Sequence, residues 1–108
     1  MKNEVARPKT IGKRGRIHTI DDKIQYFIVK DEIVHEQRIR EMKTRKLIYL
    51  QKIKFDDGRS EYRFTYYMIG LKPGAKGRWV FGQSSLMIPP KALSVVLRKA
   101  RERKWEGF

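Results

Sequence analysis

Apolar and polar residues alternate along two neighbouring stretches of the chain, residues 45–56 and 59–69. Such alternation predicts β-strands, because successive side chains of a strand point to opposite faces of a sheet. Asp57-Gly58 separates the two stretches, and this dipeptide favours the type I′ turn that joins antiparallel strands. The pattern therefore predicts a β-hairpin with a two-residue turn at its tip.

A two-residue turn would fix the register of this hairpin. It places Lys52 opposite Arg63 and Lys54 opposite Glu61, and it divides the side chains between two faces. The face predicted to join the core carries Leu47, Tyr49, Gln51, Ile53, Tyr62, Phe64, Tyr66 and Met68. The other face is basic and carries Lys46, Ile48, Leu50, Lys52, Lys54, Glu61, Arg63, Thr65, Tyr67 and Ile69. The like-charge pair of Lys52 and Arg63 fits either an anion lying over it or a solvated outer face.

Ahead of the hairpin, the β-branched and aromatic residues of 23–30 favour a strand, although Asp21 or Asp22 could instead cap a helix that reaches Glu36. Residues 31–44 fit either a short helix or an irregular connection. Residues 1–20 are basic and poor in apolar side chains, and they predict a flexible arm ahead of a single domain over residues 21–108.

After the hairpin, glycines and Pro73 predict a basic loop over residues 70–77. Residues 78–81 favour a strand, which residues 83–88 are able to continue beyond Gly82, a glycine typical of a bulge or of a close backbone approach. Pro89-Pro90 ends the strand, and a stripe of Leu93, Val96, Leu97 and Ala100 predicts a helix over residues 90–104. The elements together predict an α+β fold, with about four antiparallel strands and one C-terminal helix packed on one face of the sheet.

Composition narrows the class of protein. The chain has 26 Lys and Arg against 12 Asp and Glu, a formal net charge of +14, which favours polyanionic partners, with nucleic acid first and an anionic membrane surface second. It has no cysteine, and neither His18 nor His35 has a second ligand at metal-binding spacing, so we expect no metal and no cofactor. No apolar run approaches the roughly 18 residues of a membrane span, and we expect a cytoplasmic protein.

Basic and aromatic residues together indicate binding of single-stranded nucleic acid, in which a positive surface follows the backbone and rings stack on bases. The candidate phosphate contacts are Lys46, Lys52, Lys54, Arg63, Lys72, Lys76 and Arg78, and the candidate stacking residues are Tyr67, Trp79 and Phe81. Trp79 and Phe81 are equally suited to the core. The expected partner is single-stranded DNA, or else RNA, bound with little sequence preference.

Other functions fit parts of the sequence. An RNA-binding or ribosome-associated module would use the same residues. A metal-dependent nuclease would use Asp31 with the Glu41-Met42-Lys43 triplet, in which two carboxylates bind Mg²⁺ and the lysine steadies the attacking water. This pattern is short, and it arises readily by chance in a chain that is 35% charged. A basic regulatory protein without a nucleic-acid site is the remaining alternative.

The segment Lys72-Pro73-Gly74-Ala75-Lys76-Gly77, followed by Leu86-Met87-Ile88-Pro89 and the helix, carries a resemblance. It resembles the order of loop, strand, proline and helix in small single-stranded-DNA-binding proteins of the positive cofactor four, Whirly and Pur type. Single-stranded-DNA-binding proteins of some thermophilic archaea are similar in architecture. The resemblance covers about residues 45–104, within which residues 78–85 are additional. It implies a curved antiparallel sheet whose open face grips DNA, backed by the helix, in a homodimer or a higher oligomer.

Overall fold

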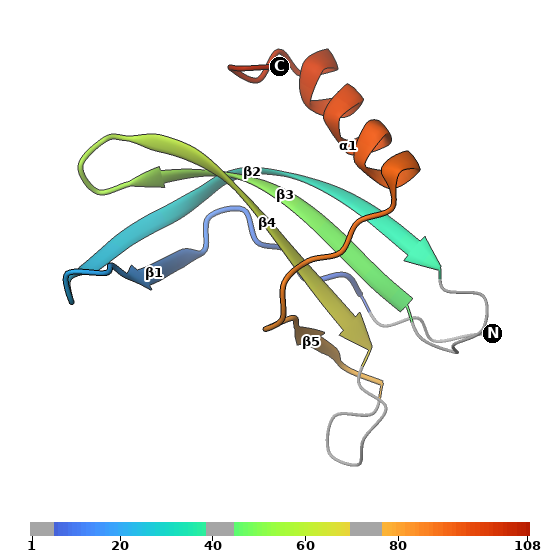
Figure 1. The fold of residues 1–108 in the computed structure, drawn as a ribbon, viewed down its shortest axis with the longest axis horizontal. Coiled ribbons are helices and arrows are strands. Elements are labelled where there is room, and N and C mark those ends of the chain that lie inside the picture. Colours follow the sequence, from blue (N-terminus) through green and yellow to red (C-terminus); the bar gives the residue numbers. More distant parts are fainter. Residues whose placement is uncertain (1–5, 39–44, 70–76) are drawn as a thin grey trace.

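The computed structural model describes residues 6–38, 45–69 and 77–108. These residues form one antiparallel sheet, whose strands follow one another in chain order, and one helix (Figure 1). The elements are β1 (Arg14–His18), β2 (Ile24–Arg38), β3 (Arg45–Phe55), β4 (Ser60–Ile69), β5 (Trp79–Phe81) and α1 (Pro90–Glu102). The expected α+β class is confirmed, with five strands in place of about four.

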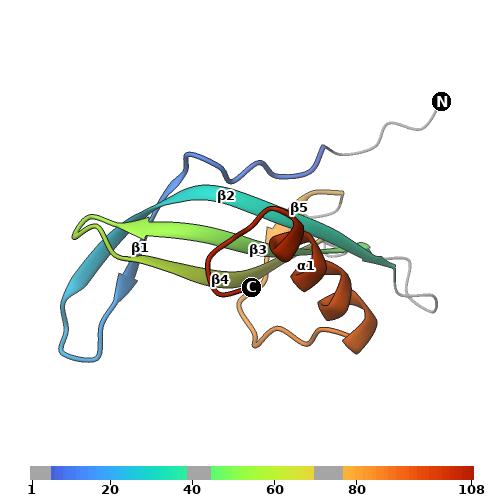
Figure 2. The same cartoon turned by 90° about the horizontal axis from the view of Figure 1, so that it is seen from above.

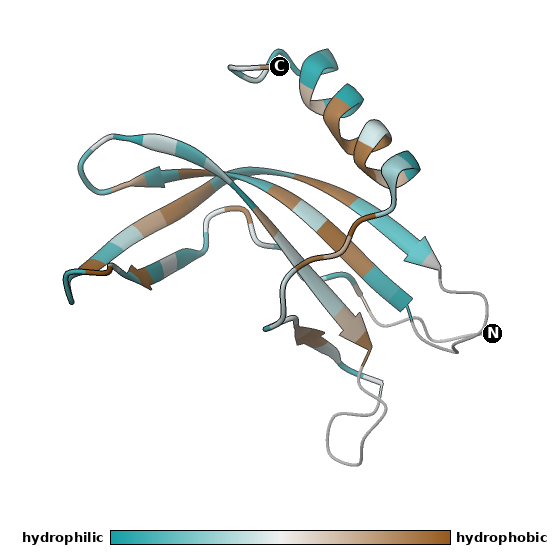
Figure 3. Cartoon of the chain, in the orientation of Figure 1, coloured by the Kyte–Doolittle hydropathy of each residue, from teal (hydrophilic) through white to brown (hydrophobic). Residues whose placement is uncertain are grey.

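The sheet curls into a half-barrel, as the curved sheet of the resemblance implied. The helix α1 lies on one side of the central strands β2, β3 and β4, and the sheet curls so that its edge strands β1 and β5 bend away to the other side (Figure 1). We call the side under α1 the helix-bearing face and the opposite side the concave face. Buried residues of β2 and β3 form the floor of the concave face, namely Phe27, Val29, Leu47, Tyr49, Gln51, Ile53 and Phe55. Figure 3 shows the apolar residues along these two strands and along the side of α1 that is turned to the sheet.

The β3–β4 hairpin forms, but the predicted register is wrong by one residue. Gln51 lies opposite Arg63, and Lys52 lies opposite Tyr62. The loop contains three residues, 56–58, since the Phe55 amide donates to the Arg59 carbonyl. Only Gly58 in this loop has a positive φ, of 90°, whereas a type I′ turn needs positive φ at two residues. A turn that ends in one left-handed glycine therefore replaces the two-residue turn.

The change of register exchanges the faces of β4 relative to β3. Arg63, Thr65 and Tyr67 join the floor of the concave face, and Tyr62, Phe64 and Tyr66 join Lys52 on the helix-bearing face. The expected like-charge pair of Lys52 and Arg63 does not form, because these side chains lie on opposite faces. The alternation within each strand was predicted correctly, and only the pairing between the strands was wrong.

The other strands also differ from expectation. Residues 14–18, expected within the flexible arm, form the edge strand β1, which pairs with the start of β2. The strand predicted around residues 23–30 is confirmed and continues to residue 38 through a bulge between Val29 and Asp31. Residues 39–44 lie outside the described part of the chain. The strand after the hairpin ends at Phe81 and does not continue over residues 83–88.

Gly82 marks the point where the chain leaves β5 and crosses toward α1. A Cβ atom at this position would overlap the Tyr66 ring, so the glycine permits a close approach of backbone to ring. Of the two roles predicted for Gly82, the structure shows the close approach. The connection that follows lies on the helix-bearing face, where the Met87 carbonyl accepts a hydrogen bond of 2.7 Å from Lys46 Nζ.

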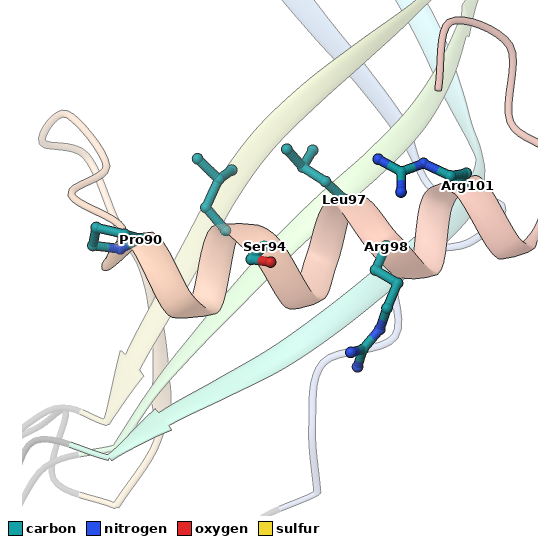
Figure 4. Close-up of a pocket in the computed structure, with 6 residues that line it drawn as sticks. Pro90, Ser94, Leu97, Arg98 and Arg101 are labelled. Carbon is teal, nitrogen blue, oxygen red and sulfur yellow. The ribbon is translucent and has the colours of Figure 1, made fainter.

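The predicted helix is confirmed, with its end at Glu102 instead of residue 104. Ala92, Val96 and Ala100 are its buried residues, and the latter two form a cluster with Ile33, Leu50 and Trp105. The helix therefore lies over β2 and β3. The sequence had predicted the β4 aromatics Tyr62, Phe64 and Tyr66 beneath the helix, but the helix does not cover them. Leu93 and Leu97 are only half-buried and line an open cavity of about 440 Å³ with Pro90, Ser94, Arg98 and Arg101 (Figure 4).

The residues after α1 fasten the C-terminus to the sheet. The indole of Trp105 donates to Asp31 Oδ2 at 3.2 Å and stacks on the Tyr62 ring, with 5.5 Å between the centroids. The Tyr62 hydroxyl donates to the Glu106 carbonyl at 2.5 Å. Trp105 is 5% exposed, so it belongs to the core of the helix-bearing face.

Candidate nucleic-acid interface

Three of the aromatic residues singled out in the sequence gather on the concave face, on β4 and β5. The rings of Tyr67 and Phe81 meet edge to face, with 5.4 Å between their centroids. Trp79 lies two residues before Phe81 and opposite Ile69, so its side chain belongs to the same face. We call Tyr67, Trp79, Phe81 and the neighbouring Arg63 the aromatic patch.

Tyr67 is held in place from below. Its ring meets the buried ring of Tyr49 edge to face, with 5.2 Å between the centroids. The Tyr49 hydroxyl donates to the Pro8 carbonyl at 2.5 Å. Burial raises the pKa of both tyrosines above the ordinary value, and phenols are neutral near pH 7 in any case. The patch thus offers uncharged rings on a rigid support, with Phe81 43% exposed and Tyr67 and Trp79 half-buried.

Arg63 provides the positive charge within the patch. Its Nε atom donates to Gln51 Oε1 at 2.9 Å, and its guanidinium lies over the Phe27 ring, 4.7 Å from the centroid. Burial lowers the pKa of Arg63 from its ordinary value, although a guanidinium remains charged at neutral pH. A second guanidinium, that of Arg45, lies 5.1 Å from the Trp79 centroid. Its charge is balanced by Glu36, whose carboxylate it meets at 2.7 Å.

The N-terminal segment covers the other half of the concave face. Thr10 is 2% exposed, and it donates through its amide to Glu32 Oε1 at 2.9 Å. Gln51 Nε2 donates to Thr10 Oγ1 at 3.0 Å, and Arg7 pairs with Glu36 at 3.5 Å. Figure 2 shows this segment on the side of the sheet opposite α1. The segment lies over β2 and β3, so the part of the concave face that stays open lies over β4 and β5.

The structure separates the predicted phosphate contacts. Arg63 lies in the aromatic patch and Arg78 is exposed just before β5, whereas Lys46, Lys52 and Lys54 lie on the helix-bearing face. Lys46 is only 9% exposed, and burial lowers its pKa while its amine donates to Met87. Lys72 and Lys76 lie outside the described residues. The prediction of one basic face that unites Lys52 and Arg63 is therefore wrong, because the hairpin register differs.

Sequence reasoning missed several residues that build this region. The supporting side chains are Thr10, Glu32, Gln51 and Tyr49, and the nearby cations are Lys13 and Arg45. Alternation along β3 placed Gln51 and Tyr49 on one face correctly, but no local signal joined that face to Arg63 and Tyr67. The contact of Thr10 with Gln51 spans 41 positions of sequence, which no periodicity reveals.

The residues of the nuclease alternative are not assembled in the described part of the chain. Asp31 accepts hydrogen bonds from Arg103 Nη1 and Trp105 Nε1, both at 3.2 Å, on the helix-bearing face. Glu41 and Lys43 lie outside the described residues. Over residues 6–38, 45–69 and 77–108, no group of three or more His, Asp or Glu side chains is placed to hold a metal ion.

In the described ranges, no helix is long and apolar enough to cross a membrane. Comparisons of the chain with protein-family models, with curated proteins and with solved structures gave no match.

Proposed function

We propose that this protein binds single-stranded nucleic acid, DNA in preference to RNA and with little sequence preference, on the aromatic patch of the concave face. The observation that carries the proposal is the meeting of Tyr67, Trp79 and Phe81 with Arg63 on one face of a chain with a formal net charge of +14. Rings beside cations are the combination that holds single strands without reading base edges.

The residues take distinct roles in this proposal. Phe81 and Tyr67 stack on bases, and Trp79 extends the platform along β5. Arg63 contacts a phosphate between the bases, and Arg78 contacts the backbone at the open end of the patch. Lys46, Lys52 and Lys54 are not assigned to the interface, since they lie on the helix-bearing face. Lys72 and Lys76 remain candidate phosphate contacts on sequence grounds alone.

The shape of the site supports a preference for single strands. The rings lie inside a curled sheet, beside the N-terminal segment, so only a base that has left its stack can lie flat against them. A duplex offers its phosphates but keeps its base faces covered. No observation favours the nuclease, because Asp31 is engaged by Arg103 and Trp105. We further propose a homodimer, because β1 and β5 are the edge strands of the described sheet and another chain could pair with them. We also propose a cytoplasmic location, on the composition of the sequence alone.

Titration of fluorescent single-stranded DNA, single-stranded RNA and duplex DNA of equal length at several salt concentrations tests the proposal. We expect the tightest binding to single-stranded DNA, with affinity that falls steeply as salt rises, because phosphate contacts release counterions. Equal weak binding to all three would leave only non-specific attraction of charges, and no binding at low salt would refute the proposal. Analytical ultracentrifugation with and without the DNA tests the dimer.

A further inference from the structure

A small cavity lies at the inner end of the aromatic patch, between the N-terminal segment and the sheet. Its volume is about 170 Å³, and it is lined by Thr10, Lys13, Arg14, Gly15, Phe27, Val29, Gln51, Arg63 and Tyr67. Pockets for drug-sized ligands measure about 300–1,000 Å³. The cavity is therefore too small for a nucleoside and suits a group of the size of a single oxyanion.

Arg63 enters this cavity in a fixed orientation. Its Nε atom donates to Gln51, whose side chain is bonded in turn to Thr10, and its guanidinium lies over the Phe27 ring. Among the described residues, no carboxylate pairs with Arg63, and its terminal Nη atoms have no hydrogen-bond partner. A half-buried guanidinium with fixed, unused donors is prepared to bind a planar or tetrahedral oxyanion through two parallel hydrogen bonds.

Lys13 supplies a second cation from the opposite wall. The Val29 amide donates to the Lys13 carbonyl at 3.0 Å, which extends the β1–β2 pairing and places the Lys13 side chain on the concave side. Arg14 lines the cavity too, but its guanidinium pairs with Asp56 at 2.9 Å and is occupied there. Two acids of this face have other partners: the Glu32 carboxylate accepts from both the amide and the hydroxyl of Thr10, and Glu61, two residues before Arg63 on β4, pairs with Arg59 at 3.2 Å.

We infer that the cavity is a phosphate pocket, which binds one phosphate group between Arg63 and Lys13. The inference rests on the proposed function, because it assigns the phosphate to a nucleic-acid strand whose bases lie on the patch. Tyr67 connects the two sites, since it lines the cavity and meets Phe81 in the patch. The bound group is either an internal phosphodiester or a terminal phosphate, and both present the same oxyanion to Arg63.

Titration of the full chain with inorganic phosphate, at constant ionic strength set by chloride, tests the pocket without any DNA. Amide and arginine Nε–H shifts in two-dimensional NMR should saturate and should concentrate at Thr10, Lys13, Gln51 and Arg63. Arg63→Gln should weaken phosphate binding roughly tenfold to a hundredfold, the weight of hydrogen bonds to a charged group. The control variant Arg98→Gln removes the same charge from the outer side of α1 and should leave phosphate binding unchanged. Shifts that spread over the basic surface, or that persist in Arg63→Gln, would overturn the inference.

Two further variants guard against misfolding of Arg63→Gln. Arg63→Lys keeps the charge but loses the forked donors, and Lys13→Gln leaves Arg63 and its contacts in place. Each variant should bind phosphate more weakly while its amide spectrum remains that of the folded protein. Unchanged phosphate affinity in both folded variants would refute the pocket.

Oligonucleotides with a 5′-phosphate or a 5′-hydroxyl identify the source of the phosphate. Tighter binding of the phosphorylated strand, lost in Arg63→Gln, assigns the pocket to a terminal phosphate. Equal binding of both strands, weakened in Arg63→Gln, assigns it to an internal phosphodiester. DNA binding that is unchanged in Arg63→Gln removes the pocket and the role of Arg63, and leaves only the rings of Tyr67, Trp79 and Phe81 as the DNA site. Saturable phosphate binding without DNA binding removes the DNA site and leaves the pocket.

Discussion

Replacing Phe81 with alanine is the sharpest test of the aromatic patch, because a matched control exists in the same sheet. Phe81 is 43% exposed on the concave face, and Phe64 is 39% exposed on the helix-bearing face. The two substitutions remove the same ring at nearly the same exposure from strands β5 and β4. Only Phe81→Ala should affect the binding of single-stranded DNA.

The magnitude follows from the contacts of the Phe81 ring. Stacking of one base on one aromatic side chain is worth about 1–3 kcal/mol. More than half of the Phe81 ring already lies against protein, including the edge-to-face contact with Tyr67, so only its exposed part is available to a base. We therefore expect a loss of about 1–2 kcal/mol, which corresponds to a dissociation constant raised about fivefold to thirtyfold.

Fluorescence anisotropy with a labelled single-stranded oligonucleotide measures both variants, and thermal unfolding shows whether each is folded. The free energy of unfolding of Phe81→Ala should also fall by roughly 0.5–1.5 kcal/mol, because the edge-to-face contact with Tyr67 is lost. Equal losses of affinity in Phe81→Ala and Phe64→Ala would refute the assignment of the interface to the concave face. A larger loss in Phe64→Ala would place the interface on the helix-bearing face.

Three other expectations test the register, the packing and the electrostatics. In the same anisotropy assay, Arg63→Glu should raise the dissociation constant for DNA about tenfold more than Lys52→Glu, since the two side chains lie on opposite faces. Equal effects would favour the register of the two-residue turn. Gly82→Ala should lower the free energy of unfolding by about 1–3 kcal/mol in urea denaturation, because the new methyl group would overlap the Tyr66 ring, and an unchanged midpoint would contradict the close approach. Burial raises the pKa of Tyr49, so the contribution of this tyrosine to stability is complete at pH values below its unfolded pKa of about 10 and is lost as the pH rises through its folded pKa. Tyr49→Phe should therefore flatten the decline of stability at alkaline pH. An identical decline in the variant would contradict the effect of burial.

The hairpin shows how far the sequence could be interpreted. Alternation along β3 and β4 placed each side chain with its own strand neighbours correctly, which is why Arg63 and Tyr67 were predicted to share a face. Asp57-Gly58, however, is compatible with a two-residue turn and with a three-residue loop in which only the glycine is left-handed. A difference of one residue in the loop reverses the pairing of the faces, and residues near the turn do not report it.

The strand β1 shows a second limit. Its sequence, RGRIH, contains a single large apolar residue, Ile17, and the strand lies largely exposed at the edge of the sheet. It is recognised only through its partner, since Gly15 leaves room for the Phe27 ring directly beneath it. The same long-range origin explains Thr10, whose contacts to Glu32 and Gln51 build the wall of the phosphate pocket.

The position of the helix α1 was predicted only in part. The spacing of Leu93, Val96, Leu97 and Ala100 gave the helix and its approximate ends correctly. The side that packs is centred on Val96 and Ala100, because Trp105 and Ile33 complete the cluster from outside the helix. Trp105 lies beyond the predicted helix, and its bond to Asp31 crosses 74 positions of sequence.

The two tryptophans of the chain allow the most direct measurement, because they lie on opposite faces. Trp79 belongs to the aromatic patch, and Trp105 is buried under the helix-bearing face. Trp105→Phe leaves Trp79 as the only indole, and Trp79→Phe leaves Trp105. Titration with single-stranded DNA should quench the fluorescence of Trp105→Phe in a saturable way, since bases stack beside Trp79, and should leave that of Trp79→Phe nearly unchanged. Saturable binding that quenches Trp105 and leaves Trp79 unchanged would contradict the concave face as the site.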